Sequence, residues 1–132
     1  MTRFLDNLQP WGALLLRLVL ALSMIVHGYQ KVSTHAELHH YVHFVASLGL
    51  PWQLGYVSAF TEFAGGILVA LGLFTRFASA LIAINMLVAL ITVGIHRGFG
   101  TYTSIAELGA IALMLCFYGA GTLALDRRLG IS

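Results

Sequence analysis

Apolar residues fill four long segments of this chain, and short polar stretches separate them. The segments cover about residues 11–31, 52–74, 77–96 and 104–125. Each is close to the roughly 20 residues that a helix needs to cross the hydrocarbon layer of a bilayer. The connections between the second and third segments and between the third and fourth are short, which makes successive helices antiparallel neighbours. The pattern therefore predicts an all-α integral membrane protein, built as an antiparallel bundle of four transmembrane helices.

The stretch between the first two spans has a different pattern. Residues 35–48 mix histidines and a glutamate with apolar residues, and Leu38, Val42 and Val45 recur at helical spacing. This combination is typical of a short amphipathic helix at a membrane interface. We expect residues 1–132 to form a single transmembrane domain, with this helix on its outer side.

Composition agrees with a bilayer location and excludes several classes of protein. Charged residues make up 9% of the chain, whereas a soluble domain carries about 25%. A net charge of +2 without a basic run argues against nucleic acid as a partner. The one cysteine, Cys116, excludes an internal disulfide and a dithiol pair, and its apolar surroundings favour a packing role.

Basic residues are divided unequally between the two ends of the predicted helices. One end carries Arg3, Arg76, Arg127 and Arg128, and the other carries Lys31 and Arg97. Lysine and arginine gather on the cytoplasmic side of membrane proteins. We therefore expect both termini in the cytoplasm.

Polar side chains near the middle of the membrane form a first layer. An ionised side chain at that depth costs at least about 2.5–3.5 kcal/mol and normally finds a partner inside the protein. At about 1.5 Å of rise per residue, Arg17, Glu62 and Asn85 lie at similar depth. We interpret them as a structural polar network, in which Arg17 and Glu62 form a buried ion pair and the Asn85 amide satisfies the remaining hydrogen bonds.

A second layer lies nearer the outer end of the helices. It contains His27, Lys31, His96 and Glu107, which are predicted to line a pocket that opens outward. A histidine beside a carboxylate can move protons near neutral pH, so His27, His96 and Glu107 are the candidate catalytic residues. The alternative is that these side chains only extend from helix ends to the interface.

Other residues are candidates for holding a ligand or a metal. Lys31 and Glu62, with the aromatic rings of Tyr29 and Tyr102, are candidate ligand-binding residues, although such rings also form the ordinary interfacial belt. His35, His39 and His43 repeat every four residues on one helical face, a spacing at which two histidines can bind a transition metal. The alternative is a polar face toward water.

Taken in order, these residues resemble the DoxX family of small four-helix membrane proteins. The matching pieces are Arg17, His27 to Lys31, Leu48 to Pro51, Glu62 to Gly66, Leu71 to Arg76, Asn85 to Ala89, His96, Glu107, Gly119 to Gly121, and Leu125-Asp126. The resemblance runs from about residue 11 to about residue 130. The family commonly has Ser-Leu-Asp near its end, and Ala124 stands here in place of the serine.

The resemblance implies a bacterial-type inner-membrane protein. The family that this chain resembles includes proteins similar to the small subunit of a thiosulfate:quinone oxidoreductase and to quinol oxidase subunits. The first hypothesis is therefore a redox-associated subunit that binds a quinone, a small oxidant or an anion in the outer pocket and works with a partner subunit of a redox complex. Two alternatives remain open: a non-enzymatic scaffold that recruits a partner, and a small-solute carrier that acts as a homo-oligomer.

Overall fold

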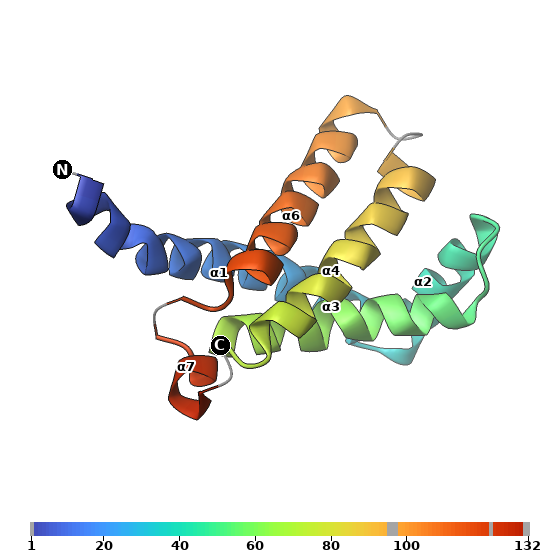
Figure 1. Cartoon of the computed structure of the whole chain (residues 1–132). Helices are drawn as coiled ribbons and strands as arrows, with labels where there is room; N and C mark the ends of the chain where they lie inside the picture. Colours follow the sequence, from blue (N-terminus) through green and yellow to red (C-terminus); the bar gives the residue numbers. More distant parts are fainter. Residues whose placement is uncertain (1, 95–97, 122, 131–132) are drawn as a thin grey trace.

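The computed structural model describes residues 2–94, 98–121 and 123–130, and within these ranges the chain forms helices and no strands (Figure 1). In chain order the elements are α1 (Thr2–Val32), α2 (His35–Ser47), α3 (Gln53–Leu71), α4 (Thr75–Ala89), the π-helical turn η1 (Leu90–Gly94), α6 (Phe99–Tyr118) and α7 (Leu125–Leu129). Four helical stretches are long and apolar enough to cross a membrane: α1, α3, α4 continued by η1, and α6. The prediction of four such helices is confirmed.

The boundaries of two of these helices differ from those predicted. α1 begins at Thr2, nine residues before the predicted start at about residue 11, and Pro10 lies inside the helix. The last long helix ends at Tyr118, seven residues earlier than expected, because Gly119 has a φ of 98°. Residues with a side chain rarely adopt that conformation, whereas glycine does so readily. Gly119 and Gly121 therefore turn the chain after α6.

α1 and α3 lie side by side and run in opposite directions (Figure 1). Gly28 of α1 touches the backbone of Phe63, and Met24 and Ile25 touch Gly66 further along α3. A Cβ on Gly28 would lie 2.5 Å from the Phe63 nitrogen. Small residues allow this close approach, which is the usual means by which helices pack in lipid.

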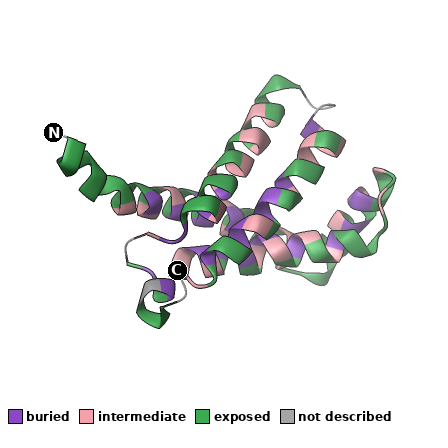
Figure 2. Ribbon diagram, viewed as in Figure 1, coloured by how far each residue is buried: buried purple, intermediate pink, exposed green. Residues whose placement is uncertain are grey.

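α4 and α6 form a second pair that leaves the first at an angle (Figure 1). Gly65 of α3 meets Ile82 of α4, and Gly109 of α6 meets Met86. The core gathers where the two pairs cross, and the far ends of α4 and α6 are mostly half-buried or exposed (Figure 2). A cavity lies between the pairs on the side where α2 lies.

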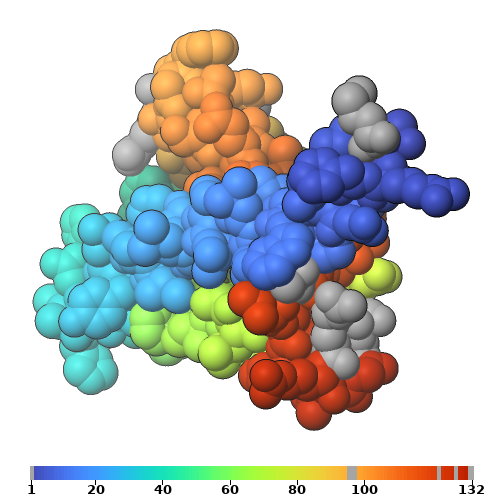
Figure 3. Space-filling view, turned by 90° about the vertical axis from the view of Figure 1, so that its left-hand side faces the viewer, coloured from blue at the N-terminus to red at the C-terminus, as the bar shows by residue number. Residues whose placement is uncertain are grey.

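The C-terminal segment returns to the ends of α1 and α3. In the space-filling view α1 crosses the face between α6 and this segment (Figure 3). Gly121 lies against Pro10 and Ala13 of α1, and Gly72, directly after α3, lies against Ala124. The chain therefore closes one end of the molecule with a turn of backbone.

α2 occupies residues 35–47, close to the amphipathic helix that the sequence predicts. Its N-terminus is capped by Thr34, whose hydroxyl accepts a hydrogen bond from the Glu37 amide at 3.1 Å. Its buried face packs on α3, where Val42 touches the backbone at Gly55. α2 thus covers the end of α3 that lies opposite the C-terminal turn.

Candidate functional site

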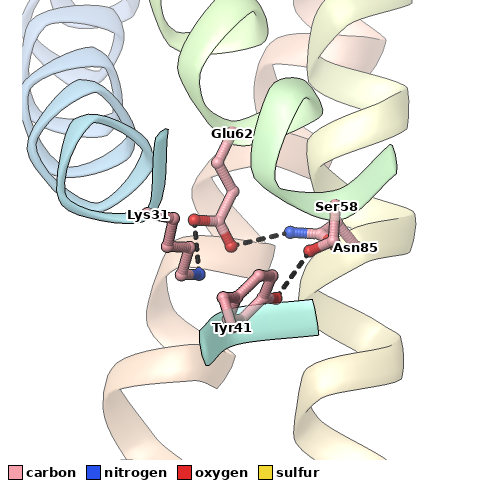
Figure 4. Close-up of polar contacts among 5 residues, drawn as sticks. All are labelled: Lys31, Tyr41, Ser58, Glu62 and Asn85. Atoms are coloured by element: carbon pink, nitrogen blue, oxygen red, sulfur yellow. Dashed lines mark hydrogen bonds and ion pairs between the residues drawn. The ribbon is translucent and has the colours of Figure 1, made fainter. Parts of the chain in front are cut away.

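A buried glutamate stands at the centre of a polar network between the helices. Glu62 on α3 is 4% exposed, and one of its carboxylate oxygens lies 2.7 Å from the Lys31 ammonium on α1 (Figure 4). Its other oxygen accepts a hydrogen bond from the Asn85 amide on α4 at 3.0 Å. Both oxygens are therefore occupied by donors from different helices.

The network continues from Asn85 to α2. The Ser58 hydroxyl donates to the Asn85 carbonyl at 2.6 Å, and the Tyr41 and Ser58 hydroxyls are 2.9 Å apart (Figure 4). Since Ser58 has one proton and gives it to Asn85, Tyr41 is the donor to Ser58. The Lys31 ammonium also lies 4.3 Å from the centre of the Tyr41 ring. This cation–π contact links the last residue of the network back to the first.

The sequence paired Glu62 with Arg17, and the structure corrects this pairing. Helical side chains lean toward the N-terminus of their helix. Lys31 lies one turn beyond Gly28, which touches Phe63, so its side chain leans back to the level of Glu62. Arg17, on the same helix, leans in the same direction, which takes its side chain away from Glu62 and toward the end where α3 stops. The sequence-based estimate used only the depth of each Cα atom and left out the direction in which each side chain leans.

Arg17 instead joins the end of α3 to the C-terminal turn. It is 1% exposed and donates hydrogen bonds of 2.9–3.1 Å to the carbonyls of Val69, Ala70, Ala120 and Leu123. The last carbonyls of a helix have no partner inside the helix and attract positive charge. Arg17 is therefore a structural cap shared by two segments that are far apart in sequence.

A second cap lies beside this one, formed by Asp126, to which the sequence assigned no role. Asp126 is 3% exposed, and its carboxylate accepts hydrogen bonds from the Phe74 and Thr75 amides at 2.6 and 2.8 Å. These amides begin α4 and lack partners within the helix, where a negative charge is favourable. The usual sequence signal for such a cap is an acidic residue in the first turn of the helix. Here the capping residue lies 51 positions from Thr75, so the sequence near α4 does not indicate it.

A cavity of about 670 Å³ lies beside the Lys31–Glu62 pair, between α1, α2, α3, α4 and α6. Its apolar wall includes Met24, Phe44, Met86, Val93, Ile105 and Leu108. Its polar lining includes His27, Lys31, His40, Glu62, Thr101 and Ser104. A volume between about 300 and 1,000 Å³ with apolar walls and a few polar groups is usual for a small-molecule site.

The structure brings only some of the predicted pocket residues to this cavity. His27, Lys31 and Glu62 line it, whereas Tyr29 and Tyr102 do not. Tyr29 packs its ring 6.4 Å from that of Phe63 and is 59% exposed. His96 lies outside the described residues.

Glu107 is also away from the cavity. Thr101, Ser104 and Leu108 line the cavity from one face of α6, and Glu107 points to another face, where it is exposed. It makes no hydrogen bond or ion pair with any other described residue. Residues one apart on a helix differ by about 100° in direction, which explains why Leu108 reaches the cavity and Glu107 does not.

The histidines of α2 do not meet at one point. His35, His39 and His43 are all exposed, and the described residues hold no group of three histidine, cysteine, aspartate or glutamate side chains able to bind one metal ion. Along a helix, eight residues span about 12 Å, which separates His35 from His43. His40, on a different face, is the histidine of α2 that lines the cavity.

Four membrane-length helices and a partly buried ion pair between two of them define a small multi-pass membrane protein. The sequence model of the DoxX family matches residues 12–97. This chain belongs to the DoxX family.

Two relatives match nearly the whole chain. "Putative oxidoreductase CatD" of Bacillus subtilis (strain 168) is 35% identical over 119 residues, covering 87% of this chain and 84% of the relative. A Haemophilus influenzae protein, named "Uncharacterized protein", is 30% identical over 138 residues, covering 94% of this chain and 95% of the relative. No solved structure matches.

Proposed function

We propose that this protein is a membrane subunit of a quinone-linked redox system and binds a quinone head group in the cavity beside Lys31 and Glu62. The observation that carries the proposal is the make-up of that cavity, which joins apolar walls to a cation, two imidazoles and four hydroxyls. The name of the Bacillus subtilis relative, an oxidoreductase, supports a redox role.

A quinone head group suits this lining chemically. It is a flat, largely apolar ring with two carbonyl oxygens that accept hydrogen bonds. The donors available are the Lys31 ammonium, the N–H groups of His27 and His40, and the hydroxyls of Thr101 and Ser104. Met24 and Met86 supply adaptable apolar contacts for the ring.

Glu62 has two roles in this proposal. It holds Lys31 toward the cavity, because the ammonium lies 2.7 Å from its carboxylate. It also lines the cavity as a carboxylate and so is a candidate proton acceptor, whereas the sequence pointed to Glu107 as the carboxylate of the pocket. His27 keeps its role as a hydrogen-bonding and proton-exchanging residue.

In the bilayer we infer an antiparallel four-helix bundle with α2 at the outer interface. The distribution of basic residues supports cytoplasmic termini. The family resemblance supports a bacterial-type inner membrane. The cavity would then open on the outer side of the membrane.

Binding of menadione, a quinone without a tail, tests the proposal. The purified protein in detergent is titrated, and quenching of tryptophan fluorescence reports binding. Lys31→Met and Glu62→Gln should each weaken binding at least tenfold, about 1.4 kcal/mol. Glu107→Gln is the matched control, because Glu107 is exposed away from the cavity. Absence of binding by the wild type, or equal loss in the control, would refute the proposal.

One observation favours a second candidate, the recruitment of a partner. Of the residues in the most apolar stretch of α6, 11% are buried inside the protein, compared with 33% in the corresponding stretches of α1 and α3. Ala110 and Glu107 lie on its exposed side. Light scattering in a mild detergent tests whether the partner is a second copy of this chain. If the wild type is an oligomer, Ala110→Trp should convert it to a monomer. A monomeric wild type would refute self-association.

The carrier alternative would gain support if Glu62 and Glu107 had similar environments, as corresponding residues of internal repeats have in some transporters. Glu62 is 4% exposed and bonded to Lys31 and Asn85. Glu107 is exposed and has no bonded partner among the described residues. The two glutamates thus have different environments, and no feature of the described residues favours a carrier.

A further inference from the structure

A second, smaller cavity adjoins the first. It has a volume of about 190 Å³ and lies between α2, α3 and α4. Its lining is mostly apolar and includes Leu54, Val57, Leu81, Ile84 and Val88. These five side chains are 38–60% exposed, so the cavity opens on the outer surface of α3 and α4. In a bilayer that surface faces hydrocarbon.

The two cavities share a wall. Tyr41, Phe44, Ser58, Ala89 and Val93 line both of them. The hydrogen bond between the Tyr41 and Ser58 hydroxyls, 2.9 Å long, crosses from α2 to α3 within this wall. The polar network therefore has Glu62 and Lys31 on the larger cavity, while Asn85 lines the smaller one.

The smaller cavity is polar where it adjoins the larger one and mostly apolar elsewhere, with Thr61 and Thr92 as its other polar lining residues. Ser58 and Asn85 lie at this inner end, and Val57 and Val88 lie toward the exposed surface. A phospholipid chain that entered from the bilayer would put its terminal methyl group against these polar groups, which is unfavourable. A ligand with its polar part inside and its hydrocarbon chain outside has the matching orientation.

We propose that the smaller cavity holds the first isoprenoid units of the quinone tail, and that the ligand is therefore a lipid quinone taken directly from the bilayer. This proposal rests on the proposed head-group site. The head group occupies the larger cavity, and the tail passes through the shared wall and leaves between α3 and α4. Rotation of the Tyr41 side chain away from Ser58 opens this path, at the cost of one hydrogen bond and one cation–π contact.

Two neighbouring residues on α4 allow a matched test. Val88 lines the smaller cavity, whereas Leu87 lines a different groove between α4 and α6. Val88→Trp should fill the cavity, and Leu87→Trp should leave it free. Val57→Trp, from the α3 side, is a second blocking variant in case Val88→Trp does not fold. Retained helix content and melting temperature show that each variant is folded.

Each variant is titrated with menadione and with a menaquinone that carries a tail of several isoprene units. Comparison with wild type in the same micelles cancels the partition of the tail into detergent. Val88→Trp and Val57→Trp should weaken binding of the tailed quinone at least tenfold and change menadione binding less than twofold. Leu87→Trp should change neither.

The outcomes separate this inference from the proposed function. If wild-type and blocked variants bind the tailed quinone equally while menadione still binds, the tail path is refuted and the head-group site stands. The same holds if native mass spectrometry finds a phospholipid retained by wild type and lost from Val88→Trp without any change in tailed-quinone binding. If neither quinone binds the wild type, both proposals fail.

Discussion

Replacement of Arg17 tests whether one side chain joins two distant parts of the fold. Arg17 donates at least four hydrogen bonds to main-chain carbonyls, two at the end of α3 and two in the C-terminal turn. Arg17→Met keeps an apolar side chain of similar length but removes every donor. The four carbonyls then lack this partner in a region where Arg17 is 1% exposed.

The expected loss follows from the cost of an unsatisfied carbonyl. A buried polar group without a partner costs about 1–3 kcal/mol. At the low end of that range, four carbonyls correspond to about 4 kcal/mol, and release of the desolvated guanidinium offsets part of any larger value. For a chain of this size we expect the melting temperature to fall by about 10–15 °C.

The single cysteine provides the assay. Cys116 is half-buried on α6, so a dye that fluoresces on reaction with thiols reports unfolding in detergent. Arg76→Met is the control, because Arg76 is exposed and donates one hydrogen bond, to the Tyr118 carbonyl at 3.2 Å. It should cost about 0–1 kcal/mol. Arg17→Lys should fall between the two, since an ammonium cannot replace the planar fork of arginine.

A melting temperature of Arg17→Met equal to that of Arg76→Met would refute this reasoning. It would mean that water or a rearranged turn satisfies the four carbonyls. If Arg17→Met lowers the melting temperature strongly and Arg17→Lys does not, the positive charge at the helix end stabilises the fold. The hydrogen-bond geometry of the guanidinium would then contribute little.

Three further substitutions probe the network, the helix register and the second cap. Lys31→Met should destabilise the protein by about 1–3 kcal/mol, because it leaves Glu62 buried without its cation, and Lys31→Met/Glu62→Gln should recover part of that loss in a double-mutant cycle. Gly28→Ala should cost about 1–3 kcal/mol by forcing α1 from α3, whereas Gly12→Ala, with open space around it, should cost nothing measurable. Asp126→Ala should cost about 1–2 kcal/mol by uncapping α4. Thermal unfolding measures all three.

Each of these predictions has a contrary result. Full additivity in the double-mutant cycle would show that Lys31 and Glu62 do not interact in solution. Equal melting temperatures for the two glycine variants would contradict the close contact of α1 and α3. An unchanged melting temperature for Asp126→Ala, with Asp126→Asn also unchanged, would show that the α4 amides find other acceptors.

The elements of the fold were largely predictable from local pattern. Long apolar segments predicted four membrane-length helices, since a helix that crosses lipid must satisfy its own backbone and show apolar side chains. Histidines mixed with Val42 and Val45 at helical spacing predicted α2. The early end of α6 was not predicted, because the conformation of Gly119 depends on the turn that it enters.

Several members of the candidate site were predictable as a set, since lysine, glutamate, histidine and asparagine are scarce inside membrane helices. Their pairing was not predictable. Lys31 and Arg17 were both available to Glu62, and the close contact at Gly28 together with the lean of helical side chains decided between them. Ser58 and Tyr41 carry no sequence signal of their own, because serine and tyrosine are common in such helices.

The sequence by itself determined that this chain has four helices of membrane-crossing length and composition, and which scarce polar side chains lie within them. Those properties depend on transfer of side chains and backbone from water to lipid, which acts on each segment separately. Only the tertiary structure decided that Glu62 pairs with Lys31, that Arg17 and Asp126 cap the ends of other helices, and that Glu107 stays outside the cavity. Those outcomes depend on helix register and side-chain direction, which are fixed only when the helices pack together.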